Sequence, residues 1–188
     1  MRIIGGSARG RRLVAPKGMR VRPTADRVKE ALFNILAAHG EGLADCRVLD
    51  LCAGTGNLGI ECLSRGAAAA VFVDNSRDSA AVIRKNLELT GFAGQSRILI
   101  QDALAALRTM EGSEQPFDLV LIDPPYGQDI LPPLLERLGD SPILASDATV
   151  VAEFSSRETM NERYGRLERT DVRTYGDTVL AFFTAMRP

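Results

Sequence analysis

Apolar residues in this chain fall into short continuous runs, separated by stretches whose apolar positions recur with helical spacing. The runs predict buried strands at 47–51, 70–74, 97–101, 117–122 and 148–153. Helices are expected between them at 57–65, 76–90, 103–110 and 129–138. Repeated strand–helix units predict an α/β fold, with a doubly wound, mostly parallel sheet and right-handed crossovers.

Different patterns flank these units at the two ends of the chain. Glycines at 5, 6 and 10 interrupt short β-like runs, which predicts a small N-terminal hairpin. A helix with Thr24 as its N-cap is expected next, because apolar residues recur at i, i+3, i+4, i+7 and i+8 from Val28. At the other end, runs at 167–174 and 178–185 flank a turn signal and predict an antiparallel hairpin.

The length of 188 residues and the apolar content of 45% predict one domain, with residues 1–40 as an extension and 41–188 as the core. The three cysteines, Cys46, Cys52 and Cys62, have neither zinc-ligand spacing nor a disulfide pattern, so we expect a reduced, cytoplasmic protein. No metal site is expected, and the single histidine, His39, is interpreted as structural. Neither a signal segment nor a membrane-spanning run is predicted.

Charge is strongly segregated, although the whole chain carries a formal net charge of only −1. Residues 1–30 contain nine Lys or Arg against two acidic residues, and the remainder contains 14 basic against 22 acidic residues. Clustered basic residues bind polyanions by releasing counterions, so this basic arm predicts contact with nucleic acid, although a merely solvated tail is the alternative. The residues expected to contact RNA are Arg9, Arg11, Arg12, Arg22 and Arg27.

A glycine-rich loop follows the first predicted strand, with glycines at 54, 56 and 59 in the order G-x-G-x-x-G. Such a loop lets a ligand approach the main chain closely, but it does not say which nucleotide binds. Asp74 ends the second predicted strand, where an acidic residue accepts hydrogen bonds from ribose hydroxyls. At this point both NAD and S-adenosylmethionine (SAM) stay open.

Two further aspartates favour SAM. Asp50, four residues before the first glycine, suits a ligand with an ammonium group better than a pyrophosphate. Asp102 follows the third strand, where it could reach the adenine end of the ligand, although each aspartate could also serve as a cap or a loop residue. The expected cofactor-binding residues are Asp50, Ala53, Gly54, Gly56, Asp74, Asn75, Asp102 and Ala103.

The most informative segment is Asp123-Pro124-Pro125-Tyr126, which follows the fourth predicted strand. Proline has no N–H and holds the preceding residue extended, so the Asp123 carboxylate and the Pro124 carbonyl are presented as acceptors. Two acceptors suit the hydrogens of an exocyclic amino group on a base, and Tyr126 offers a ring on which a splayed-out base can stack. Asp123, Pro124 and Tyr126 are therefore the candidate catalytic residues for methyl transfer to such an amino group.

These residues resemble the amino-group methyltransferases of the class I Rossmann-like fold, and more narrowly the RsmD family of 16S rRNA (guanine-N2)-methyltransferases. The blocks that carry the resemblance are Arg2–Gly6, Gly10–Leu13, Arg22–Leu36, Asp50–Glu61, Ser64–Ala67, Asp123–Tyr126 and Tyr175–Thr178. Cys52 and Thr55 depart from the phenylalanine and serine that are common at their positions in the family.

The resemblance implies a seven-stranded, mostly parallel sheet with one antiparallel strand. It also implies SAM as cofactor, methylation of N2 of one guanine in 16S rRNA, and a largely assembled small ribosomal subunit as substrate. A monomer would suit a partner of that size.

Four other functions compete with this interpretation. A DNA adenine or cytosine methyltransferase would share the Asp-Pro-Pro-Tyr segment, but usually carries an added recognition domain. A protein glutamine methyltransferase usually has Asn at the position of Asp123. An NAD-dependent oxidoreductase needs a proton relay that the sequence does not supply, and a nonenzymatic RNA-binding module would leave Asp-Pro-Pro-Tyr without a purpose.

Overall fold

A computed structural model of the protein describes residues 1–16, 23–38, 42–112 and 115–187. Strands and helices alternate through its middle, as the sequence pattern predicts. The helices are α1 (Pro23–Ala38), α2 (Asn57–Ser64), α3 (Arg77–Thr90), α4 (Ala103–Met110) and α5 (Leu131–Gly139), with a 3-10 turn at Ala93–Gln95. The strands are β1 (Arg47–Leu51), β2 (Ala69–Asp74), β3 (Ser96–Ile100), β4 (Phe117–Ile122), β5 (Leu144–Ser155), β6 (Arg163–Tyr164), β7 (Leu167–Tyr175) and β8 (Thr178–Ala185).

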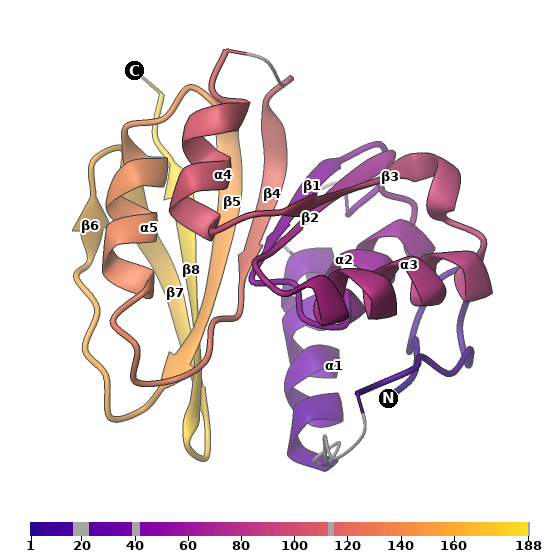
Figure 1. Cartoon of the computed structure of the whole chain (residues 1–188). Coiled ribbons are helices and arrows are strands. Elements are labelled where there is room, and N and C mark those ends of the chain that lie inside the picture. The colour runs from indigo at the N-terminus through magenta and orange to yellow at the C-terminus, as the bar shows by residue number, and fades with distance from the viewer. Residues whose placement is uncertain (17–22, 39–41, 113–114, 188) are drawn as a thin grey trace.

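All described strands join one sheet in the order β3-β2-β1-β4-β5-β8-β7-β6 (Figure 1). Strands β1 to β5 pair in parallel, and β8 enters antiparallel between β5 and β7. The expectation of seven strands is wrong, because the two-residue β6 pairs with β7 as an eighth. So short a strand, preceded by Asn161 and Glu162, shows no alternation that a sequence pattern could reveal.

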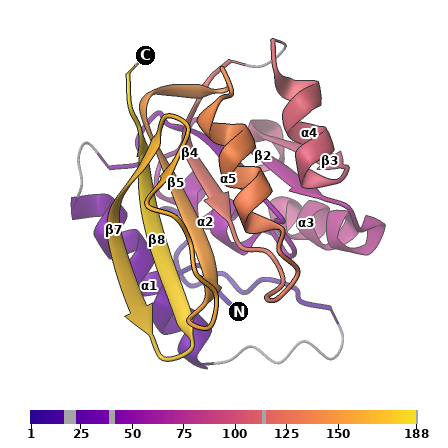
Figure 2. The same ribbon diagram turned by 90° about the vertical axis from the view of Figure 1, so that its left-hand side faces the viewer.

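Helices cover both faces of the sheet, so there are two cores (Figures 1 and 2). On one face α4 and α5 pack through residues such as Leu107 and Leu134 against Leu49, Val120 and Val150. On the other face α1, α2 and α3 pack against the side chains that alternate with these along the strands, such as Val48 and Phe72. Burial on both faces explains why the central strands read as continuous apolar runs.

The N-terminal segment is closed by a single antiparallel bridge between Arg2 and Arg12, which confirms the expected hairpin in a minimal form. Helix α1 begins at Pro23, so Thr24 is its second residue and not its N-cap. Strand β5 begins four residues earlier than expected, because the chain continues past Asp147 with a positive φ of 64° and a register shift against β4. Arg22 and His39 lie outside the described residues.

No helix among the described residues combines the length and the apolar character needed to cross a membrane. The expected hairpin at the C-terminal end is present, with the β7–β8 turn at Tyr175–Thr178. Because Ser155 pairs with Thr178, this turn lies beside the carboxyl end of β5 (Figure 1). It therefore reaches the sheet edge where the polar residues of the other strand ends gather.

Candidate active site

A cavity of about 920 Å³ opens at the carboxyl ends of the parallel strands. This edge of a doubly wound sheet is the usual place for a ligand, next to the point where the strand order reverses. All the residues predicted for cofactor binding or catalysis, apart from Gly56, line it. These residues are Asp50, Ala53, Gly54, Asp74, Asn75, Asp102, Ala103, Asp123, Pro124 and Tyr126.

Two aspartates, Asp74 and Asp50, hold the glycine-rich loop by accepting hydrogen bonds from its backbone N–H groups. Asp74, at the end of β2, accepts the N–H of Gly54 at 2.9 Å through one oxygen and the N–H of Ser76 at 2.9 Å through the other. Gly54 has a φ of +57° and open space where a Cβ would point, so its backbone faces the cavity. Gly56, with a φ of +75°, instead turns toward Ile60 and Ile83 and begins α2. The two glycines thus differ in their surroundings, since Gly54 borders the cavity and Gly56 packs against two isoleucines at the start of α2.

Asp50 is almost wholly buried at the end of β1, yet its side chain lines the cavity. Its Oδ2 accepts the N–H of Gly59 at 2.9 Å. Burial raises the pKa of this carboxyl to about 8; the Gly59 N–H acts in the opposite direction, and the nearby Asp74 adds to the rise. A buried carboxylate of this kind favours a cationic partner in the cavity, because such a partner would offset the cost of its charge.

The third strand ends at Ile100, and the two residues that follow it, Gln101 and Asp102, both line the cavity. Asp102 caps α4 by accepting the N–H of Ala105 at 3.0 Å, so its role as a helix cap coexists with its place on the cavity wall. The side-chain oxygen of Gln101 is buried and has no hydrogen-bond partner within the described residues. Unpaired buried acceptors are rare in folded proteins, and this one marks the cavity's third-strand side as a place that suits a ligand with N–H donors.

The Asp-Pro-Pro-Tyr segment leaves the end of β4 and forms the neighbouring wall of the cavity. Asp123 borders the open cavity, but the protein packed around it, with the charges of Glu153 and Asp50, raises the pKa of its carboxyl well above its usual range. Pro124 is buried, while Tyr126, which also lines the cavity, is 44% exposed. The predicted acceptor pair and the predicted stacking residue therefore stand side by side.

Glu153, in β5, is a cavity residue that the sequence analysis missed. The hydroxyl of Tyr126 donates to its Oε1 at 2.8 Å and also lies 3.1 Å from Thr178 Oγ1. Burial raises the pKa of the Glu153 carboxyl, and the Tyr126 hydrogen bond opposes that rise. A signal existed in the sequence: burying a carboxylate inside the apolar run ATVVAEF costs free energy, so its presence there indicates a hydrogen-bond partner or a function.

Acidic side chains dominate the cavity wall as a whole. The wall carries the carboxyl groups of Asp50, Asp74, Asp102, Asp123, Glu153 and Asp177. Lys29 is the one Lys or Arg on the described wall, and its Nζ is already paired with Glu61 at 3.3 Å. Among the described residues no cluster of metal-ligating side chains is arranged to hold an ion. The cavity therefore favours a donor-rich, cationic ligand over a pyrophosphate.

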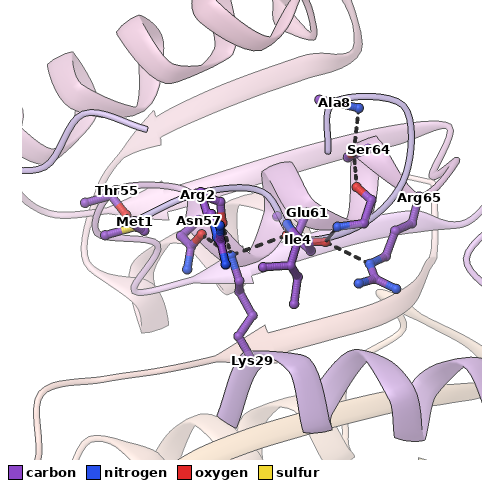
Figure 3. A network of polar contacts seen from close by, with 12 residues as sticks. Met1, Arg2, Ile4, Ala8, Lys29, Thr55, Asn57, Glu61, Ser64 and Arg65 are labelled. Carbon is purple, nitrogen blue, oxygen red and sulfur yellow. Dashed lines mark hydrogen bonds and ion pairs between the residues drawn. The ribbon is translucent and has the colours of Figure 1, made fainter. Parts of the chain in front are cut away.

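The first described part of the basic arm, residues 1–16, is fixed to the α/β core by a buried network (Figure 3). Glu61, fully buried on α2, accepts the N–H groups of Ile4 at 2.9 Å and Gly5 at 2.8 Å, and also binds Arg65 Nε at 2.9 Å. Lys29 donates to the carbonyl of Arg2 and to Asn57 Oδ1, so α1 is tied into the same network. Residues 2–5 of the arm are thus held directly against α2 and α1.

The predicted RNA-binding arginines that the structure describes lie outside the cavity wall. Arg9, Arg12 and Arg27 are exposed. Arg11 is also exposed but donates to the carbonyl of Leu89 at 2.6 Å, so it helps to hold the arm against α3. Arg22 lies outside the described residues. The described basic residues can therefore meet a polyanion at the surface while the acidic cavity receives a different ligand.

Comparisons with known proteins agree with this architecture. The family described as Conserved hypothetical protein 95 matches residues 1–184. The chain is 37% identical over 183 residues to YlbH of Bacillus subtilis, with 97% of this chain and 98% of that protein covered. It is 39% identical over 153 residues to the Escherichia coli ribosomal RNA small subunit methyltransferase D, covering 81% of this chain and 74% of that protein.

A solved structure extends the similarity to nearly the full length. The YhhF protein of Escherichia coli superposes with a TM-score of 0.84 at 30% identity, covering 99% of this chain and 98% of that one. The similarity therefore includes the N-terminal arm as well as the sheet.

Proposed function

Because the chain belongs to the RsmD family of methyltransferases, we propose that it transfers a methyl group from SAM to N2 of one guanine in 16S rRNA. One observation carries the proposal. The Asp123-Pro124-Pro125-Tyr126 segment and the aspartates at the ends of β1, β2 and β3 line the same acidic cavity. A site for an amino-group acceptor and a site for a cationic nucleoside cofactor therefore adjoin.

The cofactor would occupy the wall formed by β1, β2 and β3. Asp50 would accept the ammonium group of the methionine moiety, Asp74 the ribose hydroxyls, and Asp102 with Ala103 the adenine edge. The backbone at Ala53 and Gly54, together with Asn75, would bound the rest of the ligand. SAM supplies an electrophilic methyl group on a sulfonium centre, which an acidic cavity favours.

The acceptor base would enter over Tyr126. Stacking on an aromatic ring is worth about 1–3 kcal/mol per base. The Asp123 carboxylate and the Pro124 carbonyl would then accept hydrogens of the exocyclic amino group and aim its nitrogen at the methyl group. Catalysis by such an arrangement rests on alignment and on acceptors placed in advance.

The substrate RNA would lie along the basic arm. Exposed arginines on a segment fixed by Glu61 and Lys29 can neutralise phosphates without moving when RNA binds. We propose the small ribosomal subunit as the partner and a monomeric enzyme, with DNA as the alternative acceptor. An NAD-dependent oxidoreductase is disfavoured, because the pyrophosphate would face the carboxylates of the cavity.

An acceptor panel tests the proposal. Initial rates of methyl transfer from labelled SAM are measured with small subunits that lack the native methylation, with naked 16S rRNA and with duplex DNA. The highest rate is expected with the subunits. Methyl transfer to duplex DNA alone would support the proposed reaction but contradict 16S rRNA as its substrate.

A further inference from the structure

Glu153 and Asp123 occupy neighbouring positions at the ends of two adjacent parallel strands. In the β4–β5 ladder Ile122 pairs with Ala152, so Asp123 and Glu153 are the next residues of each strand. Both line the cavity, and the charge of Glu153 is one of the causes of the raised pKa of Asp123. An amino group held by Asp123 would therefore have a second carboxylate beside it.

Glu153 is held in a defined orientation but is not saturated by protein donors. The Tyr126 hydroxyl donates to Oε1 at 2.8 Å, and Thr178 Oγ1 lies 3.1 Å from the same hydroxyl. Among the hydrogen bonds of the described residues, this carboxylate accepts one, from the Tyr126 hydroxyl at Oε1. Since the hydroxyl of Tyr126 reaches Glu153, a base stacked on the Tyr126 ring would lie within reach of this carboxylate.

The bases differ in what they present beside the exocyclic amino group. Guanine carries N1–H next to its N2 amino group, so its edge offers adjacent donors. Adenine has the N1 lone pair beside N6, and cytosine has the N3 lone pair beside N4. A carboxylate accepts hydrogen bonds and donates none when ionised, so it matches guanine and repels the other two.

We propose that Glu153 is the residue that selects guanine, accepting the N1–H through Oε2 while Asp123 and Pro124 accept from N2. This inference rests on the proposed function and extends it from the reaction to the choice of base. The Glu153 carboxylate would attract guanine by accepting its N1–H. It would repel adenine and cytosine, because each of them places a ring-nitrogen lone pair against the carboxylate. Tyr126 acts here through its ring on the base and through its hydroxyl on Glu153.

The test uses 16S rRNA in which 2-aminopurine replaces the target guanine, reconstituted into small subunits. 2-Aminopurine keeps the 2-amino group but has a lone pair at N1 in place of the N1–H. Wild-type enzyme is expected to methylate guanine with a kcat/KM about 100-fold above that for 2-aminopurine, in the range of base discrimination by a well-placed hydrogen-bonding pair. Glu153→Gln, whose amide can both donate and accept, should reduce this ratio below about tenfold.

Tyr126→Phe serves as the matched control, because it removes the hydroxyl that holds Glu153 but keeps the ring. It should lower both rates and reduce the ratio less than Glu153→Gln does. An unchanged ratio in Glu153→Gln, with both rates lowered equally, would show that Glu153 only supports Tyr126 and would overturn the inference. So would a wild-type enzyme that does not distinguish the two bases. Wild type that leaves guanine N2 unmethylated would instead overturn the proposed function, and the inference with it.

Discussion

Glu61 on α2 and Lys29 on α1 form an ion pair at 3.3 Å in which both side chains are almost completely buried. The same carboxylate accepts two backbone N–H groups of the N-terminal arm (Figure 3). The pair therefore joins three segments that are distant in sequence: the arm, α1 and the helix that follows the glycine-rich loop. Its cavity-facing member, Lys29, places this joint next to the cofactor wall.

Glu61→Ala is expected to lower the free energy of unfolding by about 3–5 kcal/mol, because it leaves the buried Lys29 ammonium without its counter-ion and two backbone N–H groups of the arm without their acceptor. Urea denaturation followed by circular dichroism measures the change. Glu88→Ala is the control, since its pair with Lys85 is more than half exposed, and about 0–1 kcal/mol is expected there. Equal losses in the two variants would contradict a structural role for the buried network.

Asp50→Asn should change stability and ligand affinity in opposite directions. The pKa of Asp50 is about 8 in the folded protein, against about 3.9 in unfolded chains, so the folded state holds a proton that the unfolded state releases. The stability that the protonated Asp50 carboxyl contributes is fully present below about pH 4 and is lost as the pH rises through about 8. At pH 8 the variant should therefore melt at a higher temperature than the wild type.

SAM affinity of Asp50→Asn should nevertheless fall at least tenfold, because the amide cannot pair with the ammonium group. Titration calorimetry in two buffers with different ionisation enthalpies gives a second readout. Near pH 7, wild type is expected to release protons when SAM binds, and the variant to release fewer. Identical proton release by the two proteins would contradict the placement of the ammonium group at Asp50.

Tyr126→Ala should depress kcat/KM about 5- to 150-fold, the equivalent of losing about 1–3 kcal/mol of stacking on the base. SAM affinity should change little, because the cofactor-binding residues lie at the ends of the other strands. Steady-state rates and SAM titrations are measured on the same preparation. A comparable loss of SAM affinity would place the ring against the cofactor instead of the base.

Neutralising Arg9 and Arg12 together should weaken RNA binding and lower its salt dependence. Each lost phosphate contact reduces the slope of log K against log salt by about 0.7–0.9. Arg11 is left intact, because its hydrogen bond to the Leu89 carbonyl helps to hold the arm. Filter binding between 50 and 200 mM salt, roughly the range over which such contacts are resolved, measures the slope. An unchanged slope of log K against log salt would show that Arg9 and Arg12 do not contact phosphates and are only solvated.

The alternation of buried strands and amphipathic helices predicted most of the fold, because the central strands are covered on both faces and so read as apolar runs. Strand β6 was not predicted, because two residues are too few to show an alternating pattern. Strand β5 was predicted too short, because Asp147 interrupts its apolar run. These errors arose where tertiary pairing, and not local pattern, determines the strand.

The cavity residues that the sequence analysis singled out lie at or just after the end of a strand, as Asp74, Asp102 and Asp123 do. Glu153 lies within the long β5, and the Tyr175–Thr178 turn reaches the cavity only through the antiparallel return of β8. Their places depend on sheet order, which the sequence pattern did not specify. Gly56 stays a prediction as a cofactor-binding residue, since the structure describes its place at the turn into α2 and not a ligand.

The central claim is that this chain methylates the N2 group of guanine in 16S rRNA through Asp123. The most direct test digests small subunits to nucleosides after reaction with labelled SAM and identifies the labelled nucleoside by chromatography, with Asp123→Ala alongside. The account predicts label only in N2-methylguanosine, from one site per subunit, and its loss in Asp123→Ala although that variant still binds SAM. Label in methylated adenosine or cytidine, or undiminished label with Asp123→Ala, would contradict it.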